Sequence, residues 1–87
     1  MSQQTTTEVT ADVRAYVVDR FLFGQGAETL SDDASFLESG IVDSTGVLEI
    51  VMFLEQRFGI KVKDEELVPD NLDSIRNITA FVGRKLQ

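Results

Sequence analysis

An amphipathic stretch over residues 44–58 is the feature that most limits how this chain can fold. Its apolar residues recur every three or four positions, which is the period of one helix face, and they are Val47, Ile50, Val51, Leu54 and Phe58. Asp43 precedes the stretch, and an aspartate at this position caps a helix by accepting a hydrogen bond from a free backbone N–H. Gly59 follows it, where glycine commonly ends a helix. The sequence therefore predicts a helix from Ser44 to Phe58 with one buried face.

The first part of the chain predicts another amphipathic helix. Its apolar residues have the same period and are Val9, Val13, Tyr16, Val17 and Phe21. We expect it to begin at Thr5, whose spacing to a later glutamate fits a capping box, or at Thr10. It should run to about Phe23 and end at Gly24. Residues 1–7 are polar and are expected to form a disordered N-terminal tail.

Residues 24–43 form a long predicted connection. A loop of this length is unusual in a compact domain unless it packs against the body and has a function. Its apolar residues can anchor it, and they are Leu30, Phe36, Leu37, Ile41 and Val42. Residues 35–38 are expected to form one helical turn.

The segment after Gly59 predicts a connection and a short helix. Residues 60–63 alternate between apolar and basic, which fits a strand, but no other stretch offers a pairing partner. An extended connection is expected instead. Residues 64–67 begin with three acidic side chains, which favour a helix start. Pro69 should end this short helix because the residue before a proline is pushed out of helical geometry.

The last predicted helix runs from Ser74 to about Leu86, with Asp73 as its cap. Its buried residues are expected to be Ile75, Ile78, Val82 and Leu86. The predicted fold is therefore all-α: a small four-helix bundle of three longer helices and one short helix, with a long loop between the first two. At 87 residues the chain is expected to form one domain over residues 8–87.

The composition excludes several classes of function. The chain has no cysteine, so it can form neither a disulfide nor a thiolate metal site. It has no histidine, which excludes a Ser-His-Asp arrangement and argues against the alternative of a hydrolase that uses Ser44 as its nucleophile. A net charge of −7 argues against nucleic-acid binding and favours partners with basic surfaces.

Membrane and metal functions are not expected either. No apolar run approaches the length of a membrane span, and no export signal is present, so the expected compartment is the cytoplasm. Asp70, Asn71 and Asp73 lack the ligand spacing of a calcium loop, so no dedicated metal site is expected.

Ser44 is the candidate site of modification. At the first helical position its hydroxyl is expected to be exposed, where free N–H groups and the helix dipole favour a phosphate. Taken alone, a serine after a capping aspartate is also explained as an ordinary helix start.

The wider pattern is more specific. The residues Gly40-x-x-Asp43-Ser44-x-Gly46, followed by an amphipathic helix that ends in Glu-Gln-Arg-Phe-Gly-Ile, resemble the acyl carrier protein family. The resemblance extends from about Val9 to Leu86. It implies that Ser44 carries a covalent 4′-phosphopantetheine arm derived from coenzyme A. It also implies that Asp43, besides capping the helix, helps to present the serine to a phosphopantetheinyl transferase.

The resemblance implies a stand-alone, monomeric carrier and not an enzyme. Acyl or aminoacyl groups would be held as thioesters on the arm and presented to loading ligases and to synthases or transferases of fatty acid, polyketide or other secondary metabolite biosynthesis. Two apolar residues lie off the buried stripe, one turn apart, and suit a docking surface for these enzymes. The expected partner-binding residues are Thr45, Leu48, Glu49, Met52 and Glu55.

Two residues depart from the family pattern and leave alternatives open. Thr45 replaces the usual leucine, and Gly46 clears space beside the serine in a way that would suit a particular partner. The same pattern is similar to D-alanyl and aminoacyl carrier proteins, so the cargo could be an amino acid. A further alternative is a helical adaptor that uses Leu48 and Met52 for protein binding and carries no prosthetic group.

Overall fold

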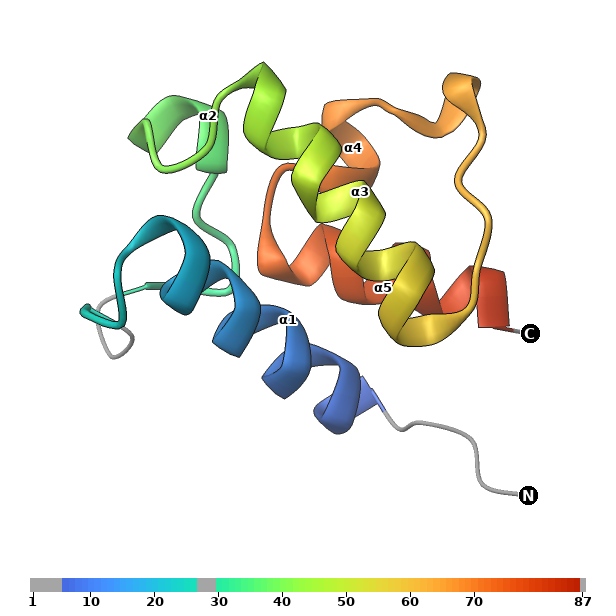
Figure 1. Cartoon of the computed structure of the whole chain (residues 1–87), viewed down its shortest axis with the longest axis horizontal. Coiled ribbons are helices and arrows are strands. Elements are labelled where there is room, and N and C mark those ends of the chain that lie inside the picture. Colours follow the sequence, from blue (N-terminus) through green and yellow to red (C-terminus); the bar gives the residue numbers. More distant parts are fainter. Residues whose placement is uncertain (1–5, 27–29, 87) are drawn as a thin grey trace.

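The computed structural model describes residues 6–26 and 30–86 (Figure 1). The helices are α1 (Thr6–Phe21), α2 (Phe36–Ser39), α3 (Ser44–Phe58), α4 (Pro69–Leu72) and α5 (Ile75–Leu86), with a 3₁₀ turn, η2 (Asp64–Glu66), before α4. The described residues contain no strand. The prediction of a small all-α bundle with three longer helices is therefore confirmed.

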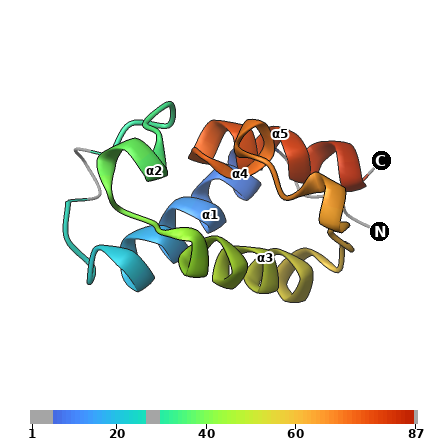
Figure 2. The ribbon, with the colours of Figure 1, turned by 90° about the horizontal axis from the view of Figure 1, so that it is seen from above.

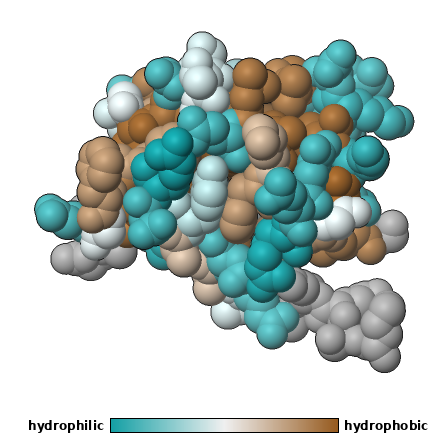
Figure 3. Space-filling model, viewed as in Figure 1, coloured by the Kyte–Doolittle hydropathy of each residue, from teal (hydrophilic) through white to brown (hydrophobic). Residues whose placement is uncertain are grey.

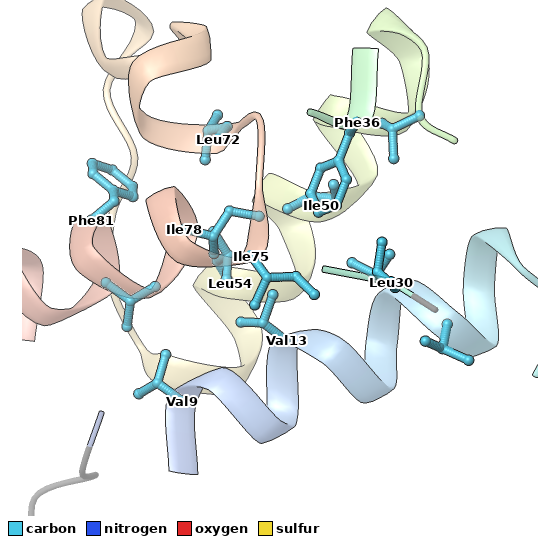
Figure 4. Packing of buried hydrophobic residues seen from close by; sticks show 14 of the residues in the cluster. Val9, Val13, Leu30, Phe36, Ile50, Leu54, Leu72, Ile75, Ile78 and Phe81 are labelled. Carbon is cyan, nitrogen blue, oxygen red and sulfur yellow. The ribbon is translucent and has the colours of Figure 1, made fainter. Parts of the chain in front are cut away.

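The three longer helices surround a common interior. Figures 1 and 2 show α2 at one end of the bundle and the connection that leaves α3 at the other. Among the described helices, α1 packs chiefly against α5. Figure 4 shows that side chains from α1, α3 and α5 meet in this interior, together with Phe36 of α2 and Leu72 of α4. The buried apolar residues are Val9, Val13, Val17, Val18, Leu30, Phe36, Val42, Ile50, Leu54, Ile60, Leu72, Ile75, Ile78, Phe81 and Val82.

Helix α3 has the predicted ends. The Asp43 carboxylate accepts a hydrogen bond from the Gly46 N–H at 2.8 Å, so it caps the helix as expected. Gly59 adopts the left-handed conformation with φ of 70° and donates its N–H to the Glu55 carbonyl. A glycine accepts this conformation with little strain, which explains why the helix ends at this position.

Helix α1 differs from the prediction at both ends. It is already helical at Thr6, and Thr10 lies within it, where its hydroxyl is hydrogen-bonded to the Thr79 hydroxyl at 3.1 Å. The predicted start at Thr5 and residues 1–5 of the predicted tail lie outside the described residues. At the other end, the helix stops at Phe21, two residues earlier than expected. Phe23 has a φ of 57°, and Gly24 donates its N–H to the Val18 carbonyl at 2.9 Å.

The predicted role of Pro69 is wrong. Pro69 begins α4 at its first turn, where a proline is well tolerated because an N–H at this position would have no acceptor within the helix. The predicted third helix is instead the short η2 turn over Asp64–Glu66.

The predicted cap of the last helix is also wrong. The Ser74 hydroxyl, and not Asp73, accepts a hydrogen bond from the Asn77 N–H at 3.0 Å at the start of α5. The Asp73 carboxylate accepts hydrogen bonds from the Ser35 hydroxyl and, at 3.0 Å, from the Leu37 N–H. Asp73 therefore holds α2 against the junction between α4 and α5.

Two residues that were expected in the core are exposed. Leu37 is 47% exposed because its neighbour Phe36 takes the inward position, and successive helical residues point about 100° apart. Leu86 is 39% exposed although it lies on the same face of α5 as the buried Val82, because it is the last residue of the helix, one turn beyond Val82.

Candidate functional site

Ser44 is exposed at the first position of α3. The carboxylate and carbonyl oxygens of Asp43 accept the N–H groups of Gly46 and Val47, respectively. The N–H groups of Ser44 and Thr45 have no acceptor in a preceding helical turn. The start of α3 therefore presents an accessible hydroxyl beside partly unsatisfied backbone donors, an environment that favours a negatively charged group.

Gly46, which follows the exposed residues Ser44 and Thr45, is buried. A Cβ at Gly46 would lie 2.8 Å from Cγ1 of Val42 and 2.9 Å from Cε1 of Phe21. The sequence suggested that Gly46 clears space for a partner. In the structure, side chains of the same chain fill that space. Gly46 thus lets the start of α3 approach the end of α1 and the loop that precedes Ser44.

An apolar cavity of about 390 Å³ opens beside Ser44. It lies between α2, the first turns of α3, and the segment from η2 to α4. Its lining residues are Leu37, Ser44, Val47, Leu48, Leu67, Val68, Pro69, Leu72 and Asp73. Figure 3 shows hydrophobic residues gathered beside the upper end of α3 and toward the connection that leads to α4.

The sequence did not predict this cavity. Leu67 and Val68 were assigned to a short helix and its end, and Leu37 was assigned to the core. All three are exposed and line the opening. The available signal was the apolar pair Leu67-Val68 in a connection that is otherwise highly charged.

The residues predicted to bind partners have different environments. Thr45 is exposed, and Leu48 and Met52 are 54% and 58% exposed. The two acidic residues of this set have partners within the chain. The Glu49 carboxylate lies 2.6 Å from the Arg20 guanidinium, and the Glu55 carboxylate accepts the Val62 N–H at 2.9 Å.

A smaller cleft of about 240 Å³ lies between α1 and α3. It is lined by Tyr16, Glu49, Met52, Phe53 and Gln56. The Tyr16 ring stacks on Phe53 with 4.1 Å between ring centroids, and its hydroxyl donates to the Glu49 carbonyl at 3.2 Å. Burial raises the pKa of Tyr16, the Glu49 charge raises it further, and Arg20 opposes this shift. The cleft therefore has an aromatic wall and one carboxylate at its edge.

The described part of the chain contains no cluster of side chains that could hold a metal ion. Within it, no helix combines the length and the apolar character needed to cross a membrane. Asn71, one of the residues considered for calcium, is used within the fold. Its amide donates to the Glu66 carbonyl and its oxygen accepts from Arg84.

Comparisons with known proteins identify relatives over most of the chain. Residues 22–82, a segment that includes α2, α3 and the cavity, match the family described as "Phosphopantetheine attachment site". A protein of Akkermansia muciniphila named acyl carrier protein is 34% identical over 72 residues, which cover 83% of this chain and 85% of that protein. One from Thermosynechococcus vestitus with the same name is 30% identical over 80 residues, which cover 92% and 94% of the two chains.

Proposed function

This chain belongs to the acyl carrier protein family, and on this premise we propose that Ser44 bears the family's 4′-phosphopantetheine arm and that the arm carries an acyl group. The observation that supports this assignment is an exposed serine at the capped start of α3, beside an apolar cavity and within the matched region.

The environment of Ser44 fits the attachment of a phosphate. Its hydroxyl is exposed, and the adjoining N–H groups and the dipole of the 15-residue helix α3 favour a negative charge at this position. The Asp43 carboxylate is held on the Gly46 N–H. This hydrogen bond fixes the helix start and keeps the serine in one place for a phosphopantetheinyl transferase.

The bound arm supplies the thiol that a chain without cysteine lacks. The chain's own residues position and present this group. Helix α3 is fixed by the core residues Ile50 and Leu54, so its exposed face offers a rigid surface to successive enzymes. We propose that the protein acts as a carrier and not as a catalyst.

The cavity beside Ser44 supports an acyl cargo over an amino acid. Its walls are almost entirely aliphatic, formed by residues such as Leu48, Val68 and Leu72. The one carboxylate in the lining, that of Asp73, already accepts hydrogen bonds from the Ser35 hydroxyl and the Leu37 N–H. An ammonium group there would therefore lose its hydration with little compensation. Each methylene of an acyl chain removed from water there contributes about 0.8 kcal/mol.

Intact mass spectrometry tests the assignment of Ser44. Wild type, Ser44→Ala and Ser39→Ala are each incubated with coenzyme A and a broad-specificity phosphopantetheinyl transferase. We expect the mass of one phosphopantetheine on wild type and on Ser39→Ala, which alters another exposed serine, and none on Ser44→Ala. An adduct on the Ser44→Ala variant would contradict the assignment.

The cargo is tested separately with the holo form. Thermal unfolding is compared for holo protein loaded with acetyl, octanoyl or alanyl groups. We expect the octanoyl form to melt at the highest temperature, because the acyl chain is sheltered in the cavity. Equal melting of the acetyl and octanoyl forms would contradict an acyl-binding role for the cavity and would leave the Ser44 assignment intact.

A further inference from the structure

Both acidic side chains on α3 are already paired within the molecule. Glu55 accepts a backbone N–H from the connection that follows the helix, so its contact is part of the fold. Glu49 is paired instead with a side chain, the Arg20 guanidinium on α1, at 2.6 Å. The side chains of Arg20 and Glu49 are 55% and 34% exposed, so this ion pair is accessible to solvent.

Glu49 lies at the edge of the cleft between α1 and α3. Tyr16 and Phe53, whose rings stack on each other, and the flexible side chain of Met52 also line it. An arginine or lysine side chain from another protein matches this arrangement. Its aliphatic stem suits the apolar side chains of the cleft, and its charged head suits the Glu49 carboxylate.

Arg20 already makes the contact that such a side chain would make. The ion pair with Glu49 shows that this carboxylate accepts a guanidinium while α1 and α3 are packed together. Exposed ion pairs contribute little to stability, so exchanging one cation for another on Glu49 costs little. The negative net charge of the chain also draws a basic surface toward it.

Docking of a basic enzyme side chain on Glu49 is already an expectation of the family resemblance. We infer in addition that Arg20 occupies this carboxylate in the free chain and that the incoming side chain must displace it. The inference rests on the proposed function, because it assumes that such an enzyme docks on α3. Arg20 is then an internal competitor that weakens docking. This role would explain why Arg20 lies beside Glu49, on a surface that otherwise suits a basic partner.

The test measures arm transfer to the full-length apo chain as a function of salt. The probe is a broad-specificity phosphopantetheinyl transferase with coenzyme A, and kcat/KM is determined for wild type, Arg20→Gln, Glu49→Gln and the double variant. Arg76→Gln is the matched control. It removes the same charge from an exposed ion pair, with Asp33, on another part of the surface.

At low salt we expect Arg20→Gln to raise kcat/KM by about 2- to 5-fold over Arg76→Gln, the range that an exposed ion pair allows. The gain should shrink as salt screens the charges. Glu49→Gln should lower kcat/KM, and Arg20→Gln should give no gain in the Glu49→Gln background.

Two results would overturn the inference while leaving the proposed function in place. In one, Arg20→Gln and Arg76→Gln behave alike. In the other, the gain from Arg20→Gln persists without the Glu49 carboxylate. A wild-type chain that gains no arm would overturn the proposed function and the inference together. Intact mass spectrometry of the same samples separates these cases.

Discussion

Gly46 lies two residues after Ser44 and is closely packed against side chains of the same chain. Gly46→Ala would place a Cβ within 3 Å of both Val42 and Phe21. The valine is buried and has few alternative rotamers, so the strain should exceed the gain of about 1 kcal/mol in helix propensity. We expect a net loss of about 1–2 kcal/mol in unfolding free energy, measured by chemical denaturation.

Gly83 in α5 is the matched control for this prediction. A Cβ at Gly83 meets no atom within 4 Å, so only the propensity term applies. Gly83→Ala should stabilise the protein by about 0.5–1 kcal/mol. If the two alanine variants shift the denaturation midpoint in the same direction, close packing around Gly46 is not the reason for its glycine.

The predictability of single residues depended on whether their partners were near in sequence. The capping role of Asp43 was predictable because its carboxylate and the Gly46 N–H that it accepts are three residues apart. The role of Asp73 was not, because its carboxylate contacts Ser35 and Leu37, which are 38 and 36 residues away. A sequence pattern carries no direct signal for such contacts.

At the scale of elements, α2 depends on a contact from outside itself. With four residues it is far too short to be stable alone, and Asp73 holds its start through the Leu37 N–H and the Ser35 hydroxyl. Asp73→Ala should therefore loosen α2 and cost about 1–3 kcal/mol, as for other charged hydrogen bonds that lose one partner. Hydrogen exchange of the α2 amides and thermal melts measure the two effects.

Asp70→Ala is the control for Asp73→Ala, since Asp70 is an exposed acidic residue on the neighbouring helix α4. Its removal should cost about 0.5 kcal/mol through the α4 dipole and leave exchange in α2 unchanged. Equal exchange of the α2 amides in the two variants would contradict the tethering role of Asp73.

The phase of α3 gives another prediction. Leu54 is completely buried and Gln56 is exposed, two positions along the same helix. Leu54→Ala should cost about 2–5 kcal/mol because it leaves a cavity in the core, whereas Gln56→Ala should change stability by less than about 0.5 kcal/mol. Thermal melts that do not distinguish these variants would show that the assigned helix phase is wrong.

Helices with a long apolar period were predictable. Of the short ones, α2 was anticipated as a single turn over residues 35–38, whereas α4 was not. Fifteen residues of α3 and twelve of α5 repeat the pattern often enough to define a buried face. Helix α4 has four residues, too few for a period, and Pro69 was therefore interpreted by its usual effect of ending a helix. The cavity beside Ser44 depends on how α2 and α4 approach α3, so it was unpredictable for the same reason.

At the scale of the whole molecule, an ion pair between η2 and α5 links stability to pH. The Lys63 N–H and then the Lys85 ammonium hold the pKa of Glu66 below its ordinary value of 4.5. A carboxyl with a lowered pKa stabilises the fold above its ordinary pKa, and this contribution is lost as the pH falls through the lowered value. Glu66→Gln should thus melt below wild type at pH 7, and the difference should shrink below about pH 4.

Glu65→Gln is the control, since Glu65 is the exposed neighbour of Glu66. It removes the same charge without removing the contact at 3.0 Å between Glu66 and Lys85. Melting temperatures are compared from pH 7 to pH 3. A difference between wild type and Glu66→Gln that stays constant across this range would contradict the assigned linkage.

The packing of α1 on α5 has a consequence for the order of events during synthesis. Val13 of α1 and Ile75 of α5 lie together in the core (Figure 4), and Thr10 is bonded to Thr79. A ribosome adds only about 5–20 residues per second, so for several seconds the apolar face of α1 has no α5 to cover it. The buried face of α3 is fully packed in the core only when α5 has emerged from the ribosome. We therefore expect an enzyme that recognises the folded face of α3 to act only after α5 has been made.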